Sequence, residues 1–511
     1  MRSAATAAAL LALALPAFPY STSASAKLVA YDNQGRLLDA AKLAAYVGRA
    51  DKRGGPAVWG WSPEGLHAQR PALMQKGDAL TLSWDKAPLL ILSLPWPVAD
   101  DGFSTVLVDR DGRGIANGDT IKLNEEIALT QYRLFKEAWL KHSKDREPKY
   151  QPSPKARHLA DRARDAIAEA QLSQDPSQRA KLFDRALRDV STAWQKLLAE
   201  HGAQVAASKA GGALRYGLTL DDSLLNRLDH YEWLIQEVER SGSNWVRLVF
   251  RPNPSDFGYE KQASFNEYDA AVKELRARNI RIMGCVLDTT QWPSSMTPAL
   301  FAERARRLAL HFKGQINSWE VGSELNGDWL GGRKSPLAPE DAFRIYQAAA
   351  SELKRLDSSL ETVATLYWWE GTAPDEEHTL FGWLSKYVPR GFGRDLDVVS
   401  LSLWPEDNPV GMSLERIFQR THDALPEKRL MLGSYGYVEG EELKGYWWLD
   451  PKDVDGARKD LVTLLTPASA ALDASVGGGF WWQTFDQMLP TKNKATDLYK
   501  VYKATVKKLA K

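Results

Sequence analysis

Cysteine, surplus charge and long apolar runs are scarce in this 511-residue chain, and each scarcity excludes a class of protein. The one cysteine, Cys285, excludes an internal disulfide, and its apolar neighbours indicate an inert core thiol. The formal charge of +1 provides no large field, so nucleic acid is not an expected partner. Beyond the first 26 residues no segment is apolar enough to span a membrane.

Ligand motifs for metals and phosphates are also missing. The histidines are scattered without the spacing of metal ligands, as His158, His230 and His378 illustrate. No glycine-rich strand-to-helix turn is followed by a lysine, which argues against a phosphate site. We therefore expect neither a metal nor a cofactor.

The first 26 residues have the pattern of a secretory signal. Arg2 precedes a run rich in alanine and leucine, and the small residues Ala24, Ser25 and Ala26 form a cleavage site. The apolar run is shorter than the ~20 residues of a spanning helix. We expect a mature chain that begins at Lys27, is exported to the periplasm or the medium, and has no membrane span after signal removal.

Tryptophan is in excess. The chain has 19 tryptophans, about three times what a typical usage of ~1.3% would place in it. The apolar face of a pyranose ring stacks on an indole, and carbohydrate-handling proteins use tryptophan for this reason. We expect several of these side chains to line a sugar groove and the others to lie in the core.

A repeat of short apolar runs and amphipathic helical segments fills the C-terminal part of the chain. Nearly wholly apolar strands that alternate with helices are typical of a parallel sheet covered on its outside. Eight such repeats predict a closed (β/α)8 TIM barrel over residues 213–511, in the α/β class. The expected strands are 214–220, 245–250, 280–287, 316–321, 363–367, 398–403, 430–433 and 478–483.

Two other units precede the predicted barrel. Residues 27–125 have short strand-like runs between turns and predict a small β-rich, sandwich-like domain. Its Trp59, Trp61 and Trp96 either contact polysaccharide or pack the sheet against the barrel. Residues 126–207 predict a helical connecting segment whose charged residues form a solvated face.

Active groups in such barrels lie at the carboxyl ends of the strands, and here acids and aromatics dominate those ends. The segment 316–328 delivers Glu324 from a buried strand into a polar loop, between Trp319 and Trp329. A partly buried carboxyl in aromatic surroundings is placed like the general acid for a glycosidic bond. The residues expected to bind substrate are Arg251, Asp288, Asn326, Trp329, Trp369, Trp404, Tyr435, Tyr437, Trp482 and Gln483.

Two of these strands resemble those of the clan of retaining glycoside hydrolases with (β/α)8 barrels, which includes the family 10 xylanases. Residues 242–250 are similar to the second strand of the clan, where an arginine enters the site, and residues 319–326 are similar to the fourth, where an Asn-Glu pair supplies the acid/base. The resemblance implies that Glu324 is the acid/base and that the substrate is a polysaccharide or oligosaccharide. Ser323 stands in the place of the asparagine.

The seventh strand departs from the pattern of the clan, because Ser434 stands where the nucleophilic glutamate belongs. Glycoside hydrolysis requires two carboxyl groups, and a serine hydroxyl does not replace one. Three possibilities stay open: a base from the following loop (Glu439 or Glu441), a carboxylate from another strand end (Asp486, Glu370, Asp288 or Glu406), or a barrel that binds sugar without cleaving it.

The sequence therefore predicts an exported glycoside hydrolase-like protein with Glu324, Asp486 and Glu439 as candidate catalytic residues. The alternative is a non-catalytic polysaccharide-binding protein on a degenerate glycosidase barrel, which would serve export or attachment of an exopolysaccharide.

Overall fold

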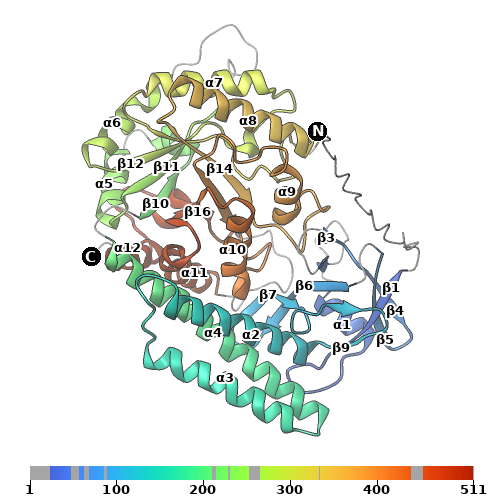
Figure 1. Ribbon diagram of the computed structural model, residues 1–511. Coiled ribbons are helices and arrows are strands. Elements are labelled where there is room, and N and C mark those ends of the chain that lie inside the picture. Colours follow the sequence, from blue (N-terminus) through green and yellow to red (C-terminus); the bar gives the residue numbers. More distant parts are fainter. Residues whose placement is uncertain are drawn as a thin grey trace, which may run out of the picture.

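A closed barrel of eight parallel strands forms the C-terminal part of the molecule (Figure 1). This computed structural model describes residues 23–47, 57–62, 68–85, 89–209, 214–227, 231–252, 265–332, 334–438 and 453–509. The predicted TIM barrel is confirmed. Its strands are β10 (Arg215–Leu220), β11 (Trp245–Val249), β12 (Arg281–Cys285), β13 (Ser318–Glu320), β14 (Glu361–Tyr367), β15 (Val398–Leu403), β16 (Arg429–Tyr435) and β17 (Ser475–Trp481).

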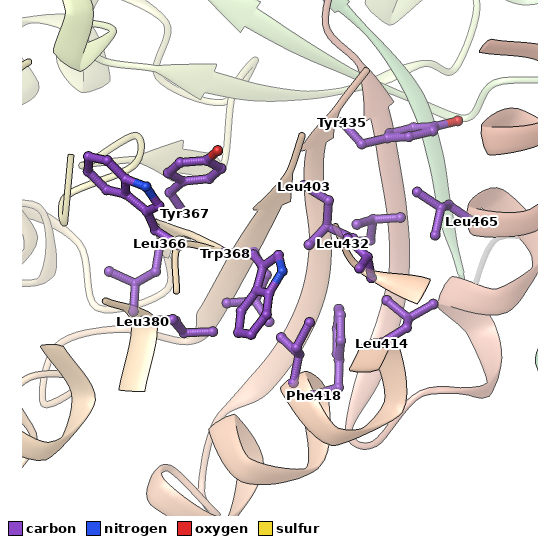
Figure 2. Close-up of a cluster of buried hydrophobic side chains, with 14 of the residues drawn as sticks. Leu366, Tyr367, Trp368, Leu380, Leu403, Leu414, Phe418, Leu432, Tyr435 and Leu465 are labelled. Atoms are coloured by element: carbon purple, nitrogen blue, oxygen red, sulfur yellow. The ribbon is translucent and has the colours of Figure 1, made fainter. Parts of the chain in front are cut away.

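Amphipathic helices surround the barrel, because each must bury one apolar stripe against the strands. They are α5 (Tyr231–Ser241), α6 (Asp269–Ala277), α7 (Pro298–His311), α8 (Pro339–Leu356), α9 (Leu380–Tyr387), α10 (Leu414–Ala424), α11 (Val454–Ala468) and α12 (Asp497–Leu509). Shorter helical turns are η1 (Asp222–Arg227), η3 (Asn266–Tyr268), η4 (Thr289–Gln291), η5 (Gly411–Ser413), η6 (Ser469–Ala471) and η7 (Thr484–Met488). Leu414 and Phe418 of α10 pack on the outer faces of β15 and β16, beside Leu403 and Leu432 (Figure 2).

The barrel interior changes in character from one layer to the next. One apolar cluster packs between the strands of the barrel: Trp245, Met283, Val363, Val398, Met431 and Phe480. One pleat further along, Arg247, Glu320 and Thr365 form a buried polar layer. Only side chains that hydrogen-bond one another can occupy such a position at an acceptable free-energy cost. The layer of Arg247, Glu320 and Thr365 is therefore a polar floor. It lies beneath the mouth of the barrel, which is the opening at the carboxyl ends of the strands.

Two small sheets precede the barrel, as predicted. One has the strand order β4-β5-β1-β9, and the other β3-β2-β6-β7 with β8 beside β6. A short helix, α1 (Ala40–Val47), packs with them. The strands are β1 (Ala24–Val29), β2 (Trp59–Trp61), β3 (Ala68–Gln69), β4 (Ala72–Lys76), β5 (Ala79–Trp84), β6 (Leu89–Val98), β7 (Gly102–Val108), β8 (Ile115–Ala116) and β9 (Thr120–Lys122).

The tryptophans of these sheets belong to the core. Trp59, Trp61 and Trp96 are each only 2% exposed, so they pack the sheets and the interface with the barrel. The indole of Trp61 donates a 3.0 Å hydrogen bond to Glu370, which follows β14. These three side chains are therefore not available to a polysaccharide on the surface.

The expected cleavage site lies inside the first strand. Residues 24–26 pair antiparallel with β5, and the Ser25 amide donates to the side chain of Asn117. Residues 1–22 lie outside the described part of the chain. Export therefore stays a prediction. Among the described residues, no helix is both long and apolar enough to cross a bilayer.

Three helices connect the sheets to the barrel: α2 (Leu123–Lys144), α3 (Pro154–Leu172) and α4 (Pro176–Ser208). Both α3 and α4 begin with proline in the first turn after a capping residue, Ser153 or Asp175, whose side chain accepts a backbone N–H. The long helix α4 contacts β6 on one side and α11 and α12 on the other. It therefore holds the two parts of the molecule together (Figure 1).

A buried polar cluster joins these helices to α10. His201 Nε2 lies 2.7 Å from the carbonyl oxygen of Pro148, which can only accept, so Nε2 carries the hydrogen. The nitrogen Nδ1 of the neutral ring then accepts from His142 Nδ1 at 2.5 Å. His142 Nε2 lies 3.0 Å from Glu415, whose other oxygen accepts from Trp194. Burial lowers the pKa of His201 to about 4.

We predict that His201→Gln reduces the acid sensitivity of the fold. The unfolded imidazole binds a proton near pH 6.5, whereas the native ring does not until about pH 4. As the pH falls from 6.5 to 4, this group therefore lowers the free energy of unfolding of wild type by about 1 kcal/mol per pH unit. Urea unfolding at pH 7.5 and 5 should show the stability difference between wild type and variant shrinking at the lower pH. The exposed His158→Gln is the control, and parallel pH curves for wild type and His201→Gln would contradict the prediction.

Candidate active site

Glu324 lies just beyond β13 at the mouth of the barrel, in a backbone conformation that costs free energy. Its φ is +52°, in the left-handed region, where a non-glycine residue costs roughly 1–2 kcal/mol. The turn is held because Leu325 N donates to Thr365 O and Gly327 N donates to Glu324 O. A Cβ at Gly322 would lie 2.5 Å from Leu325, so this turn also requires glycine. The surrounding strands therefore impose the position of Glu324.

The surroundings of Glu324 favour its protonated form. The pKa of this carboxyl is raised to about 7, mainly by burial and to a smaller extent by the negative charge of Asp288. Hydrogen bonds from Ser402 and Trp404 act in the opposite direction, and Trp404 Nε1 lies 2.7 Å from Oε1. The carboxyl is therefore partly protonated at neutral pH, as a general acid must be.

Arg247, on β11, is the centre of the polar floor and has 0% exposure. Its Nε donates to Glu320 Oε2 at 2.7 Å, and its Nη2 donates to Ser323 Oγ at 3.1 Å and to Asp288 Oδ2 at 3.3 Å. Burial lowers the pKa of Arg247, but Glu320, Cys285 and Asp288 outweigh burial and raise it. The guanidinium therefore stays charged and connects β11, β12 and the turn that carries Glu324.

Asp288, at the end of β12, is the carboxylate whose charge acts on Glu324. One oxygen accepts from the backbone and the side chain of Thr290, and the other accepts from Arg247 and from Ser323 at 3.2 Å. Four hydrogen bonds hold this carboxylate in place at 4% exposure. Its lone pairs are engaged, so it acts through its charge more readily than as a base.

Aromatic side chains stand around these groups. Trp404 and Trp482 are both partly exposed and meet edge to face, with their centroids 6.4 Å apart. The guanidinium carbon of Arg247 lies 4.9 Å from the ring of Trp482. Trp329 and Trp369, 5.6 Å apart, form a second aromatic group with Tyr367. The partly exposed rings give the mouth apolar faces of the kind that sugars use.

Tyr367, at the end of β14, connects Glu324 to the next loop. The negative charge of Glu324 raises the pKa of this phenol, after the larger effects of burial and of Asp407. The phenol donates to Asp407 Oδ2 at 2.5 Å and accepts from Asn408 at 2.8 Å. This network fixes the loop after β15 beside the candidate acid.

The other predicted residues have different surroundings. The amide of Asn326 is engaged with the backbone of Tyr367 and His378, so it holds loops together. Arg251 is partly exposed and pairs with Glu267 at 2.7 Å. Asp486 is exposed and lies 3.7 Å from Arg227. Glu439 lies outside the described residues.

Three further predicted residues come from the ends of β16 and β17. Tyr435 is fully buried, and its hydroxyl pairs with Thr466 of α11 at 2.7 Å, away from the mouth (Figure 2). Tyr437 is 5% exposed, and its carbonyl accepts from Gln487. Gln483 also accepts from Gln487. Ser434, in the place of the missing nucleophile, is buried within β16.

Arg247 and Glu320 of the polar floor were not among the predicted site residues. Arg247 lies within the second-strand motif, but Arg251 was expected to bind substrate. Glu320 lies within the fourth-strand motif, yet its pairing with Arg247 depends on strands 73 residues apart. A charged residue within an otherwise apolar strand was the available signal, since such groups are rarely buried without a partner.

We predict that Glu324→Gln stabilises the protein increasingly as the pH rises. The native carboxyl keeps its proton up to about pH 7, whereas the unfolded carboxyl loses it near pH 4.5. Wild-type stability therefore falls as the pH rises through this window, and glutamine has no proton to lose. Urea unfolding should show that the free energy of unfolding of the variant, relative to that of wild type, rises by about 1–3 kcal/mol between pH 5 and pH 8. A pH-independent difference would contradict this, and the exposed Glu427→Gln is the control.

No protein-family model matches the chain, and no curated protein matches it. Solved structures do match. A family GH10 endoxylanase from a sugarcane soil metagenome is 15% identical, with 57% of this chain and 96% of that chain covered and a TM-score of 0.42. Xylanase 10B from Thermotoga maritima is 12% identical, with 60% and 98% covered and a TM-score of 0.41.

Aphid myrosinase is another such structure, 13% identical, with 58% of this chain and 99% of that chain covered and a TM-score of 0.40. At these identities the likeness concerns the fold alone. The barrel is similar to those of glycoside hydrolases, including the family 10 xylanases that its second and fourth strands resemble.

Proposed function

We propose that this protein is an exported glycoside hydrolase-like enzyme that acts on a polysaccharide or oligosaccharide, with Glu324 as its general acid/base. The observation that carries the proposal is the environment of Glu324. Its carboxyl stands at the mouth of the barrel, beside indoles, with a pKa raised to about 7 by burial. Export is supported by the signal-like pattern of residues 1–26.

In the proposed reaction, the protonated carboxyl of Glu324 gives its proton to the glycosidic oxygen as the bond to the anomeric carbon breaks. The N–H of Trp404, 2.7 Å from Oε1, stabilises the carboxylate that this transfer leaves behind. The oxygen of a water molecule then forms the new bond to the anomeric carbon, and the carboxylate of Glu324 accepts the proton that this water loses. Glu324 thus returns to its protonated state at the end of the cycle.

The positive charge that develops at the anomeric carbon requires a negative partner. Asp288 supports this role, since its charge already acts on Glu324 and its position is held by Arg247, Ser323 and Thr290. It acts as a fixed negative charge, because its oxygens are engaged in hydrogen bonds. Trp404 and Trp482 would support the sugar rings.

A second candidate function is binding without cleavage, and two observations favour it. Ser434 occupies the seventh-strand position of the nucleophile, and the carboxylate of Asp288 is saturated with hydrogen bonds. A protein with these features would hold a polysaccharide at the indoles of the mouth, for export or attachment of an exopolysaccharide. Hydrolysis is preferred because sugar binding alone gives no reason for the strained, partly protonated Glu324.

Incubation with a panel of β-glucans, xylans and mannans tests the proposal. We expect new reducing ends from wild type, and a loss of turnover of about 10²–10⁴-fold in Glu324→Gln with polysaccharide binding retained. Glu267→Gln, which removes an exposed carboxyl paired with Arg251, is the matched control. Full activity of Glu324→Gln would remove Glu324 from the mechanism. Binding by wild type without new reducing ends across the panel would establish the second candidate.

The rate on an active substrate should also depend on pH in a defined direction. The general acid must be protonated, and the pKa of Glu324 is about 7. We expect turnover to fall about tenfold per pH unit above this value. Initial rates between pH 5 and 9 measure the effect, and a rate that stays constant from pH 7 to 9 would contradict the role of Glu324.

A further inference from the structure

The strand β1 lies in the middle of its sheet, with β5 on one side and β9 on the other. Its residues 24–28 pair antiparallel with residues 80–84 of β5, in a register that places Ala24 opposite Trp84. The pairing with β9 begins only at Lys27. The first three residues of β1 are therefore the partners of the last three residues of β5.

Residues 24–26 also contribute side chains and hydrogen bonds to the fold. Ala26 is 2% exposed and belongs to the hydrophobic core. The Ser25 amide donates to Asn117 Oδ1 at 2.9 Å, and the Ser25 carbonyl accepts from the Gly118 amide at 2.7 Å. These two bonds hold the turn that precedes β9. Loss of residues 24–26 would expose apolar surface of β5 and remove both bonds.

A new chain start also places a charge, because the α-amino group is mostly protonated at neutral pH. At Lys27 this group would stand in the middle of the paired strand, where the Lys27 nitrogen donates to the carbonyl of Asp119 at 2.8 Å. At Ala24 it would stand at the end of the pairing, opposite Trp84 and near the exposed Asp85 that follows β5. An ammonium group costs less free energy at an open strand end than inside a sheet.

The sequence has a second pair of small residues at the spacing that signal cleavage requires. Such a site has small residues at its first and third positions. Ser21 and Ser23 have this spacing, and Ser23 directly precedes β1, whereas Ala24 and Ala26 lie within the strand. Ser23 is exposed and outside the strand. Cleavage after Ser23 would therefore leave β1 whole.

We propose that the signal segment is removed between Ser23 and Ala24, so that the mature chain begins with the first residue of β1. Water cleaves this peptide bond, which leaves a carboxylate on Ser23 and an ammonium group on Ala24. The proposal rests on the export that is part of the proposed function. It is independent of the chemistry at the barrel mouth.

Export of the full-length chain from a Gram-negative host tests the site, with N-terminal sequencing and intact mass measured on the exported protein. We expect Ala24 as the first residue. Ser23→Leu places a large side chain at the third position of the site, so the product that begins at Ala24 should no longer form. Thr22→Leu is the matched control, because the middle position is not restricted, and it should be processed as wild type is.

Two results of this experiment overturn the proposal. One is an exported wild-type chain that begins at Lys27 or at any residue other than Ala24. The other is an unchanged amount of the Ala24 product in Ser23→Leu.

Chains with defined first residues test the physical reason for the site. Chains that begin at Ser23, Ala24 or Lys27 can be released from an N-terminal fusion by a protease that leaves no added residue. In thermal unfolding we expect the Lys27 chain to have a Tm about 2–4 °C below that of the Ala24 chain. The Ser23 chain is the matched control and should equal the Ala24 chain, since Ser23 is exposed. Equal Tm values for the Ala24 and Lys27 chains would overturn the proposal.

The glycosidase activity has a separate readout, which is reducing-end release by the Ala24 chain. Absence of hydrolysis by this chain contradicts the proposed chemistry and leaves the processing site unaffected. A different first residue in the exported protein contradicts the processing site and leaves the proposed chemistry unaffected.

Discussion

The buried ion pair between Arg247 and Glu320 is the interaction on which the mouth of the barrel depends. It is connected to the turn that carries the candidate acid, because Arg247 also donates to Ser323. Removal of one partner from such a pair typically costs 3–5 kcal/mol, because the other charge is left buried. The same guanidinium holds Asp288 and Ser323. The position of Glu324 therefore depends on a pair that is not itself at the surface of the mouth.

Carboxylates also hold the barrel to the units that precede it. Glu370, after β14, accepts from Trp61 and Ser93 of the N-terminal sheets. Glu415 of α10 accepts from Trp194 of α4 and faces His142 of α2. Each carboxylate is buried and accepts hydrogen bonds from donors of another unit.

Much of the fold could be predicted, because the pattern that specifies it is local. The apolar run that predicts residues 398–403 coincides with β15, and Pro339–Leu356 is a helix with proline in its first turn. Strand ends were less accurate: β13 is only Ser318–Glu320, shorter than its apolar run, because pairing with β12 and β14 ends there. The tryptophans of the N-terminal sheets could not be assigned, since the burial of a side chain depends on partners distant in sequence.

The sequence by itself determined the barrel, the two preceding units and the place of Glu324 at a strand end, because hydrophobic periods and strand-to-loop transitions are local properties. Only the tertiary structure decided that Arg247 rather than Arg251 lies beneath the mouth, that Asp288 lies close enough to act on Glu324, and that Tyr435 points to α11. These outcomes depend on the direction of each side chain relative to neighbouring strands, and a shift of one residue reverses that direction. Burial, which raises the pKa of Glu324, is likewise a property of the assembled chain.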